Sequence, residues 1–337
     1  MDFTLSKKHE MARTLFKEFA EKEVKPLAQD VDENEQFPVE TVAKMAKAGF
    51  LGIPVPKEYG GQGCDPLTYV MCVEELSKVC GTTGVIVSAH TSLCIDPIQT
   101  FGTEEQKKKY IPDLASGKKL GAFGLTGVVE KRGRKMKEIS AFIVEKGTPG
   151  FTFGTKEKKM GIRGSATYEL IFEDCRIPKE NLLGKQGKGF GIAMHTLDGG
   201  RIGIASQALG LAEGALERTI EYVKERKQFG RSIGQFQNTQ FQLADMATKV
   251  EAAKQLVYKA AMAKATQKVY SVEAAMAKLY AAEVAMEVTT KAVQLHGGYG
   301  YIREYDVERM MRDAKITEIY EGTSEVQRMV ISGNLLK

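Results

Sequence analysis

Hydrophobic residues recur at helical spacing through the first third of the chain. Within residues 11–19 they fall four positions apart between Lys and Glu, which gives one apolar stripe of an amphipathic helix. A second helix is expected over residues 38–49, because proline favours the first turn of a helix and glycine the position after its end. Residues 85–98 are almost uncharged and predict a buried helix. We therefore expect residues 1–118 to form an all-helical domain.

The hydrophobic period changes after residue 118. Within residues 167–173, apolar side chains at every second position fall on one face, as in a strand. Residues 139–144 form another β-prone run, and glycine and proline punctuate the text at residues 147–154. Residues 119–185 are therefore expected to form a small antiparallel β-domain.

Long helices return in the last part of the chain. Three carry apolar residues at three-and-four spacing and a shorter one follows, at residues 204–223, 241–265, 272–295 and 323–334. These lengths predict an antiparallel four-helix bundle over residues 186–337. Helices, then strands, then helices indicate an α+β fold with segregated parts.

Composition narrows the function only slightly. The net charge of +5 is small for 337 residues and the basic residues are mixed with acidic ones, so we expect no nucleic-acid partner. None of the five cysteines forms a C-x-x-C pair, so buried free thiols in a reducing compartment are expected, and no metal site. The N-terminus fits neither a signal nor an import peptide, and no apolar run could span a bilayer. A cytoplasmic protein without a membrane partner is expected.

The most informative string covers residues 319–327 (IYEGTSEVQ). Glu321 lies before a glycine and between apolar positions, and Thr323 with the following Ser-Glu pair is a signal for a helix N-terminus. A carboxylate just outside a helix start, beside a glycine that permits close backbone approach, could act as a base near a ligand. The alternative is a helix-capping loop with a solvated glutamate, which spacing alone favours.

Three further strings allow a structural and a functional interpretation. Residues 294–301 form a glycine-rich turn that either stops a helix or lets backbone amides approach a phosphate. His296 in this turn is expected to pack or hydrogen-bond rather than to catalyse. Arg226 suits the negative end of a helix, or it could pair with a pyrophosphate. The two glycines in residues 197–201 (LDGGR) cost about 1 kcal/mol each inside a helix, so we expect a break or a ligand-facing kink. A purely structural kink is the alternative.

The order of six strings is more specific than any one of them. They cover residues 123–126, 160–163, 197–201, 226–230, 294–300 and 320–325. In this order the chain resembles the acyl-CoA dehydrogenases over essentially its whole length. It is most similar to the short-chain, butyryl-CoA type of anaerobic bacteria.

The resemblance implies a role for Glu321. In the family, the matching glutamate removes the α-proton of an acyl-CoA thioester while a hydride leaves Cβ for the flavin of FAD. Removal from water raises the pKa of such a base and improves its match to the weakly acidic α-proton. Some relatives place the base at the position of Gly200, which has no side chain here.

The resemblance also implies binding residues. Those for FAD are Phe123, Leu125 and Thr126 at the isoalloxazine and Thr323, Ser324 and Glu325 in the C-terminal loop. Arg226, Phe229, Gln237 and the turn Gln294, Leu295, His296, Gly297 and Gly298 match residues that hold the adenine-diphosphate half of a neighbouring subunit's FAD. Asp198, Gly199, Gly200, Arg201 and Gly322 match substrate-side positions. A shared cofactor implies a homo-oligomer, in the family usually a tetramer, that is, a dimer of dimers.

One departure from the family follows Thr126. The family continues with several strands that cover the flavin, whereas this chain continues with residues 127–133 (GVVEKRG) and rejoins the pattern at about Ile139. The β-domain is therefore expected to be incomplete. Either the deletion is real and weakens FAD binding, or the sequence lacks residues of the protein, which the close match on both sides favours. In the second case the chain should be discontinuous or frayed after Thr126.

The predicted function is FAD-dependent α,β-dehydrogenation of a short-chain acyl-CoA, butyryl-CoA to crotonyl-CoA or the reverse. Electrons would pass to or from an electron-transferring flavoprotein. The alternatives are a non-catalytic paralogue that keeps the helical assembly surface, and an acyl-CoA oxidase.

Overall fold

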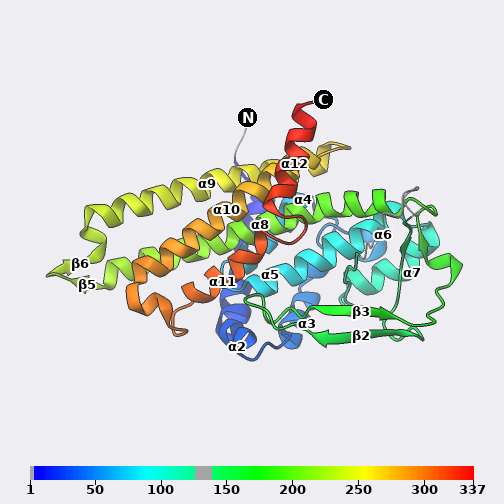
Figure 1. Ribbon diagram of the computed structural model, residues 1–337, viewed down its shortest axis with the longest axis horizontal. Helices are drawn as coiled ribbons and strands as arrows, with labels where there is room; N and C mark the ends of the chain where they lie inside the picture. The colour runs from blue at the N-terminus through cyan, green and yellow to red at the C-terminus, as the bar shows by residue number, and fades with distance from the viewer. Residues whose placement is uncertain (1–3, 126–138) are drawn as a thin grey trace, which may run out of the picture.

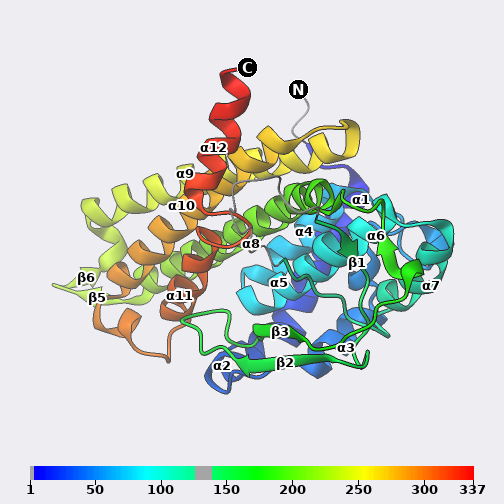
Figure 2. The same ribbon diagram turned by 45° about the vertical axis from the view of Figure 1, so that its right-hand side comes forward.

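The computed structural model describes residues 4–125 and 139–337 (Figures 1 and 2). The string after Thr126, and Thr126 itself, lie outside these ranges, so the prediction about chain continuity there stays a prediction. The N-terminal part is helical, as expected. Its α-helices are α1 (Lys7–Phe19), α2 (Ala28–Glu33), α3 (Val39–Lys47), α4 (Pro66–Ser77), α5 (Gly81–Ser88), α6 (Asp96–Phe101) and α7 (Glu104–Ala115).

The expected N-terminal helices are present with one change. The predicted helices over residues 11–19 and 38–49 correspond to α1 and α3. The uncharged run 85–98 is divided among the end of α5, a π-helical segment (Ala89–Ile95) and the start of α6. Side-chain caps start three of these helices: Ser6 accepts from the His9 N–H at α1, Asp65 accepts from the Thr68 N–H at α4, and Thr103 forms a capping box at α7.

Helix α4 joins the N-terminal helices to the C-terminal bundle. Nearly all of its residues are buried, and it packs between α1 and the long helix α8 (Gly189–Glu225). Glycines on α8 allow this close approach, because a Cβ at Gly210 would lie 2.3 Å from Glu74 O and one at Gly214 would lie 2.1 Å from Lys78 O. One hydrophobic core therefore runs through both helical parts.

The middle of the chain forms short antiparallel ribbons. Strand β1 (Ala141–Phe142) pairs with β4 (Leu182–Leu183), and β2 (Phe151–Lys156) pairs with β3 (Tyr168–Phe172). Phe151 opposes Phe172, with the rings stacked 4.7 Å apart. Several large apolar side chains of the β2–β3 ribbon are exposed. Within the described residues these are two-stranded sheets, in keeping with the small antiparallel region expected there.

The C-terminal helices are long, as predicted, but two details differ. Helices α8, α9 (Gln237–Thr266) and α10 (Ser271–His296) pack on one another, and α11 (Val307–Thr317), which was not predicted, packs on α8 and α10. Helix α12 (Ser324–Leu335) contacts α10 and projects from the body of the molecule (Figure 1). The hairpin β5 (Lys227–Gln228) and β6 (Arg231–Ser232) joins α8 to α9.

The break expected at residues 197–201 is wrong, and the kink expected as its alternative stays a prediction. Helix α8 runs without interruption from Gly189 to Glu225, through Gly199 and Gly200. Both glycines are buried against neighbouring helices, so packing offsets their low helix propensity.

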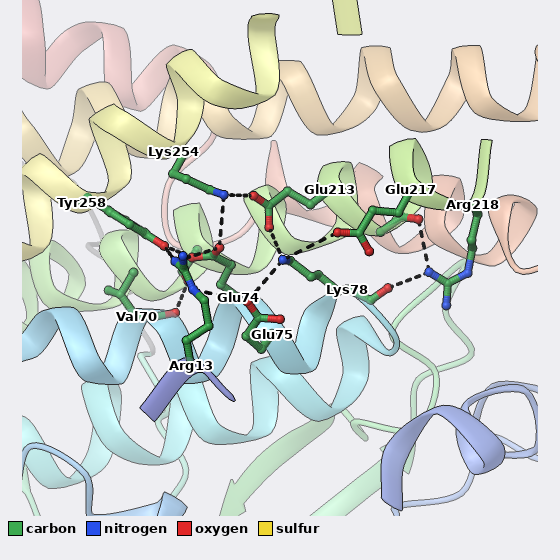
Figure 3. Close-up of polar contacts among 12 residues, drawn as sticks. Arg13, Val70, Glu74, Glu75, Lys78, Glu213, Glu217, Arg218, Lys254 and Tyr258 are labelled. Carbon is green, nitrogen blue, oxygen red and sulfur yellow. Dashed lines mark hydrogen bonds and ion pairs between the residues drawn. The ribbon is translucent and has the colours of Figure 1, made fainter. Parts of the chain in front are cut away.

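A network of buried charges crosses this interior (Figure 3). Glu74 on α4 is fully buried and Glu213 on α8 nearly so. Lys254 on α9 forms ion pairs with both carboxylates, and Lys78 forms one with Glu213 at 2.9 Å. Each of these buried charges therefore has a partner of opposite sign, as the cost of burying an unpaired ion requires.

Across the described ranges, we find no helix that combines the length and the hydrophobicity needed to cross a membrane.

Candidate active site

Glu321 lies in the short loop between α11 and α12. Its backbone is left-handed, with φ of 55°, and Gly322 follows at φ of 94°. The loop closes through the Ser324 N–H, which donates to Glu318 O at 2.9 Å. Thr323 is the N-cap of α12, so this part of the capping interpretation is confirmed.

The carboxylate of Glu321 is not solvated, so the capping-loop alternative is wrong on this point. Its Oε2 atom is buried and has no hydrogen-bond partner among the described residues. It lies against α8 at Gly200, where a built Cβ would come within 2.0 Å of Oε2 and 2.7 Å of a Leu93 methyl carbon. Any side chain at position 200 would therefore displace this carboxylate.

Burial dominates the electrostatics of Glu321. It raises the pKa of the carboxyl group to about 8, against the opposing effect of the Lys278 and Arg201 cations. The adjacent Tyr320 is half-buried, its removal from water raises the pKa of its hydroxyl, and this hydroxyl donates to Gln207 Oε1 on α8. A carboxyl group that titrates near neutral pH is suited to exchanging a proton with a bound molecule.

Three buried side chains hold the backbone that directly follows this carboxylate. Arg201 Nε donates to Glu321 O at 3.4 Å, and Lys278 Nζ donates to Gly322 O at 2.7 Å. Gln327 Nε2 donates to the same two carbonyls, at 3.3 and 2.8 Å. The loop is therefore fixed from α8, α10 and α12 together.

The structure brings most of the expected substrate-side residues together. Gly200, Arg201 and Gly322 all lie beside Glu321. The Asp198 carboxylate accepts from Arg201 Nη1 at 2.6 Å and from the Ser271 hydroxyl, and its assignment to the substrate side stays a prediction. It orients Arg201. Gly199 faces another polar group, since its Cβ would lie 3.0 Å from Lys264 Nζ.

The expected FAD-binding residues fall into two groups by the part of FAD that each is expected to hold. Phe123 and Leu125 lie in the extended segment after α7, and Thr323, Ser324 and Glu325 lie at the start of α12. Ser324 Oγ is buried without a partner among the described residues. Arg226 and Phe229 lie instead at the far end of α8, about 37 Å from Arg201 at the usual rise of an α-helix.

The second group surrounds the β5–β6 hairpin, at one end of the molecule in Figure 1. Phe229 is 92% exposed, and a Cβ at Gly297 or Gly298 would meet open space. Gln237 starts α9 beside the hairpin. His296 is buried, with Nδ1 bonded to Ala292 O at 2.7 Å and its ring stacked on Tyr222, as the packing interpretation predicted.

Sequence reasoning missed Lys278 and Gln327. Lys278 stands in the apolar stripe of α10 that Ala274, Ala281 and Ala285 continue at three-and-four spacing. A single lysine at a core position of a helix was therefore the available signal. Gln327 lies inside the quoted 319–327 string, where nothing distinguished it from a surface residue.

Comparison with known proteins identifies the class. Residues 6–118 match the family model described as acyl-CoA dehydrogenase, N-terminal domain, and residues 187–336 match the acyl-CoA dehydrogenase, C-terminal domain. The chain belongs to the acyl-CoA dehydrogenase family, and it is an oxidoreductase of that family.

Individual relatives point to its short-chain branch. A short-chain specific acyl-CoA dehydrogenase of Clostridium acetobutylicum is 55% identical, with all of both chains covered. The solved butyryl-CoA dehydrogenase of Megasphaera elsdenii is 45% identical with a TM-score of 0.96, again over all of both chains. A chain of the structure on the electron-transferring flavoprotein of Acidaminococcus fermentans is 51% identical with the same TM-score and coverage.

The alignment with the Clostridium acetobutylicum enzyme indicates that this chain is shorter than its relative. That alignment extends over 379 positions, 42 more than the 337 residues of this protein. Neither of the two matched family models covers residues 119–186. This agrees with the expectation that part of the middle region is missing relative to the family.

The family cofactor is FAD, and an acyl-CoA dehydrogenase from Bacillus anthracis solved with FAD is 33% identical with a TM-score of 0.90, over 98% of this chain and 67% of that one. The described residues fit parts of this cofactor. The unpartnered Ser324 Oγ at the start of α12 is a free polar contact, and the open glycines Gly297 and Gly298 beside Arg226 suit a phosphate.

Proposed function

We propose that the protein interconverts a short-chain acyl-CoA and its α,β-unsaturated product, butyryl-CoA and crotonyl-CoA, with Glu321 as the base. The observation that carries this proposal is the buried, unpartnered Oε2 atom of Glu321 facing Gly200. A base so placed has no competing partner for the substrate proton, and burial gives its carboxyl group a pKa of about 8.

In the forward direction the Glu321 carboxylate takes the α-proton, and the C–H electron pair becomes the Cα–Cβ double bond. FAD would supply the acceptor for the hydride that leaves Cβ. Arg201 and Gln327 hold the Glu321 carbonyl, so the carboxylate keeps one position during the transfer. Gly200 leaves the space that the carboxylate occupies. In the reverse direction the protonated Glu321 returns its proton to Cα.

The cofactor contacts proposed for this chain fall at its two separate groups. Phe123, Leu125, Thr126, Thr323, Ser324 and Glu325 would hold the flavin, and Arg226, Phe229, Gln237 and the 294–298 turn would hold the adenine half of a partner's FAD. The separation along α8 supports this division, because one end of each chain would complete the site of another. We therefore propose a homo-oligomer, a dimer of dimers.

An electron-transferring flavoprotein is the proposed electron partner, supported by the 51% identity to the Acidaminococcus chain. We also propose that the chain has three domains, with boundaries after residues 118 and 185, and that the protein is cytoplasmic. The non-catalytic alternative requires loss of FAD, which a flavin absorbance spectrum of the purified protein decides.

The test compares the wild type with Glu321→Gln. Butyryl-CoA added without oxygen should bleach the flavin of the wild type. The Gln variant should keep its flavin and bleach at least about a thousandfold more slowly, about 4 kcal/mol of barrier, because an amide cannot take the α-proton. Glu283→Gln, which removes a surface carboxylate on α10, should bleach at the wild-type rate. A Glu321→Gln variant with a tenth of the wild-type rate would show that Glu321 is not the base.

A further inference from the structure

Lys278 is an unusual residue at its position. It is fully buried, on the face of α10 that Ala274, Ala281 and Ala285 otherwise form. Taking an ammonium group out of water costs several kcal/mol even after relaxation. Its Nζ nevertheless donates to a carbonyl oxygen, Gly322 O at 2.7 Å, rather than to a carboxylate. A residue needed only to fill this space could have been apolar.

The carbonyl that Lys278 holds belongs to the residue directly after Glu321. Both residues have positive φ, a conformation that is strained for Glu321 because it carries a side chain. The same carbonyl accepts from Gln327, so two donors from different helices fix this peptide. The backbone at Glu321 is therefore kept in a form that it would not adopt freely.

Charged groups on several neighbouring segments act on Lys278. Glu321 in the α11–α12 loop, Glu318 at the end of α11 and Glu325 on α12 attract its positive charge, and Arg201 on α8 repels it. Burial lowers the pKa of Lys278 to about 8, so the group is still mostly charged at pH 7. Of the cations that act on the Glu321 carboxylate, Lys278 has the larger effect.

We propose that Lys278 is the positioning residue of the base, fixing the Gly322 carbonyl and holding a positive charge beside the Glu321 carboxylate. This inference rests on the role of Glu321 proposed above. The hydrogen bond sets where the carboxylate points. The charge keeps the carboxylate ionised, and therefore able to accept a proton, at lower pH than burial alone would allow.

The experiment measures the rate of flavin bleaching by saturating butyryl-CoA from about pH 6 to about pH 10. This range brackets the pKa values of Glu321 and Lys278. Lys278→Met keeps the volume of the side chain, and Lys278→Gln keeps a donor without the charge. Removing the cation should raise the pKa of Glu321, so the rising limb of the rate should move to higher pH by about one unit or more in both variants. At pH 7 the rate should fall about tenfold, and it should approach the wild-type rate at high pH.

Lys291→Met is the matched control, since it removes a lysine of the same helix that pairs with Glu287 at the surface, and its profile should match the wild type. A purely structural role for Lys278 would lower the rate by one factor at every pH, and this result would overturn the inference. If Lys278→Met does not retain FAD, Lys278→Gln alone decides.

Glu321→Gln separates the two proposals. If that variant is active, the proposed base is wrong. If it is inactive and the pH profiles of the Lys278 variants match the wild type, only the positioning role is rejected.

Discussion

Glu321 shows how far a single residue can be interpreted from its neighbours in sequence. The string around it located the loop, the glycine and the capping Thr323, and the structure agrees on all three. The neighbouring sequence alone favoured a solvated carboxylate, which is wrong. Burial against Gly200 raises its pKa, and the cations that oppose this, Lys278 and Arg201, lie on other helices, so spacing within the loop could not reveal either effect.

Gly200→Ala tests the contact between α8 and the base. The added Cβ would lie 2.0 Å from Glu321 Oε2, so the carboxylate must move. A displacement of about 1 Å at a reacting group can cost about a hundredfold in rate, and we expect a loss of that order in flavin bleaching, with flavin content unchanged. Gly191→Ala is the control, because Gly191 lies on the same helix and its Cβ would meet no atom within 4 Å. Equal rates for the two variants would contradict the geometry proposed here.

At the scale of elements, the long amphipathic helices were predictable and the exceptions have physical causes. Intrinsic propensity predicted a break in α8 at Gly199 and Gly200, but tertiary packing against neighbouring helices outweighs about 1 kcal/mol per glycine. Helix α11 was missed because its eleven residues are rich in charge. Its buried residues include the charged Arg309 and Asp313, and Asp313 accepts the Ile162 N–H at 2.6 Å. That contact couples α11 to the middle segment.

Arg226→Ala tests the far end of α8. We expect a lower ratio of flavin to protein after gel filtration and a melting temperature of the flavin-free protein close to that of the wild type. The reason is that Arg226 closes α8 at the exposed hairpin, where loss of its charge leaves a pyrophosphate unpaired but removes little packing. Lys224→Ala removes an exposed basic residue from the same helix end and should keep its flavin. Unchanged flavin occupancy in Arg226→Ala would reject this assignment.

At the scale of the whole molecule, the sequence predicted separate helical parts, and the structure joins them through one core. The buried charges of Figure 3 cross that junction. Glu74, Glu213 and Lys254 look like ordinary surface residues of amphipathic helices when each helix is considered alone. Their burial follows from the stacking of α4, α8 and α9, which glycines at the α4–α8 contact allow, and no helical periodicity encodes that stacking.

Lys254→Met tests whether this junction depends on charge balance. Lys254 pairs with Glu213 and Glu74, and removing one member of a buried ion pair costs about 3–5 kcal/mol because the remaining charge has lost its partner. We expect a lower melting temperature at pH 8.

Burial and the nearby Glu213 raise the pKa of Glu74 well above its usual value, so Glu74 takes up a proton as the pH falls. A group with a raised pKa contributes stability that is present at low pH and lost as the pH rises through its folded value. The deficit of Lys254→Met should therefore shrink between pH 8 and pH 5. Lys249→Met, on the same helix, removes a more exposed pair with Glu287 and should cost at most about 1 kcal/mol at either pH. A Lys254→Met deficit that stays constant with pH would show that protonation of Glu74 does not relieve the loss of Lys254.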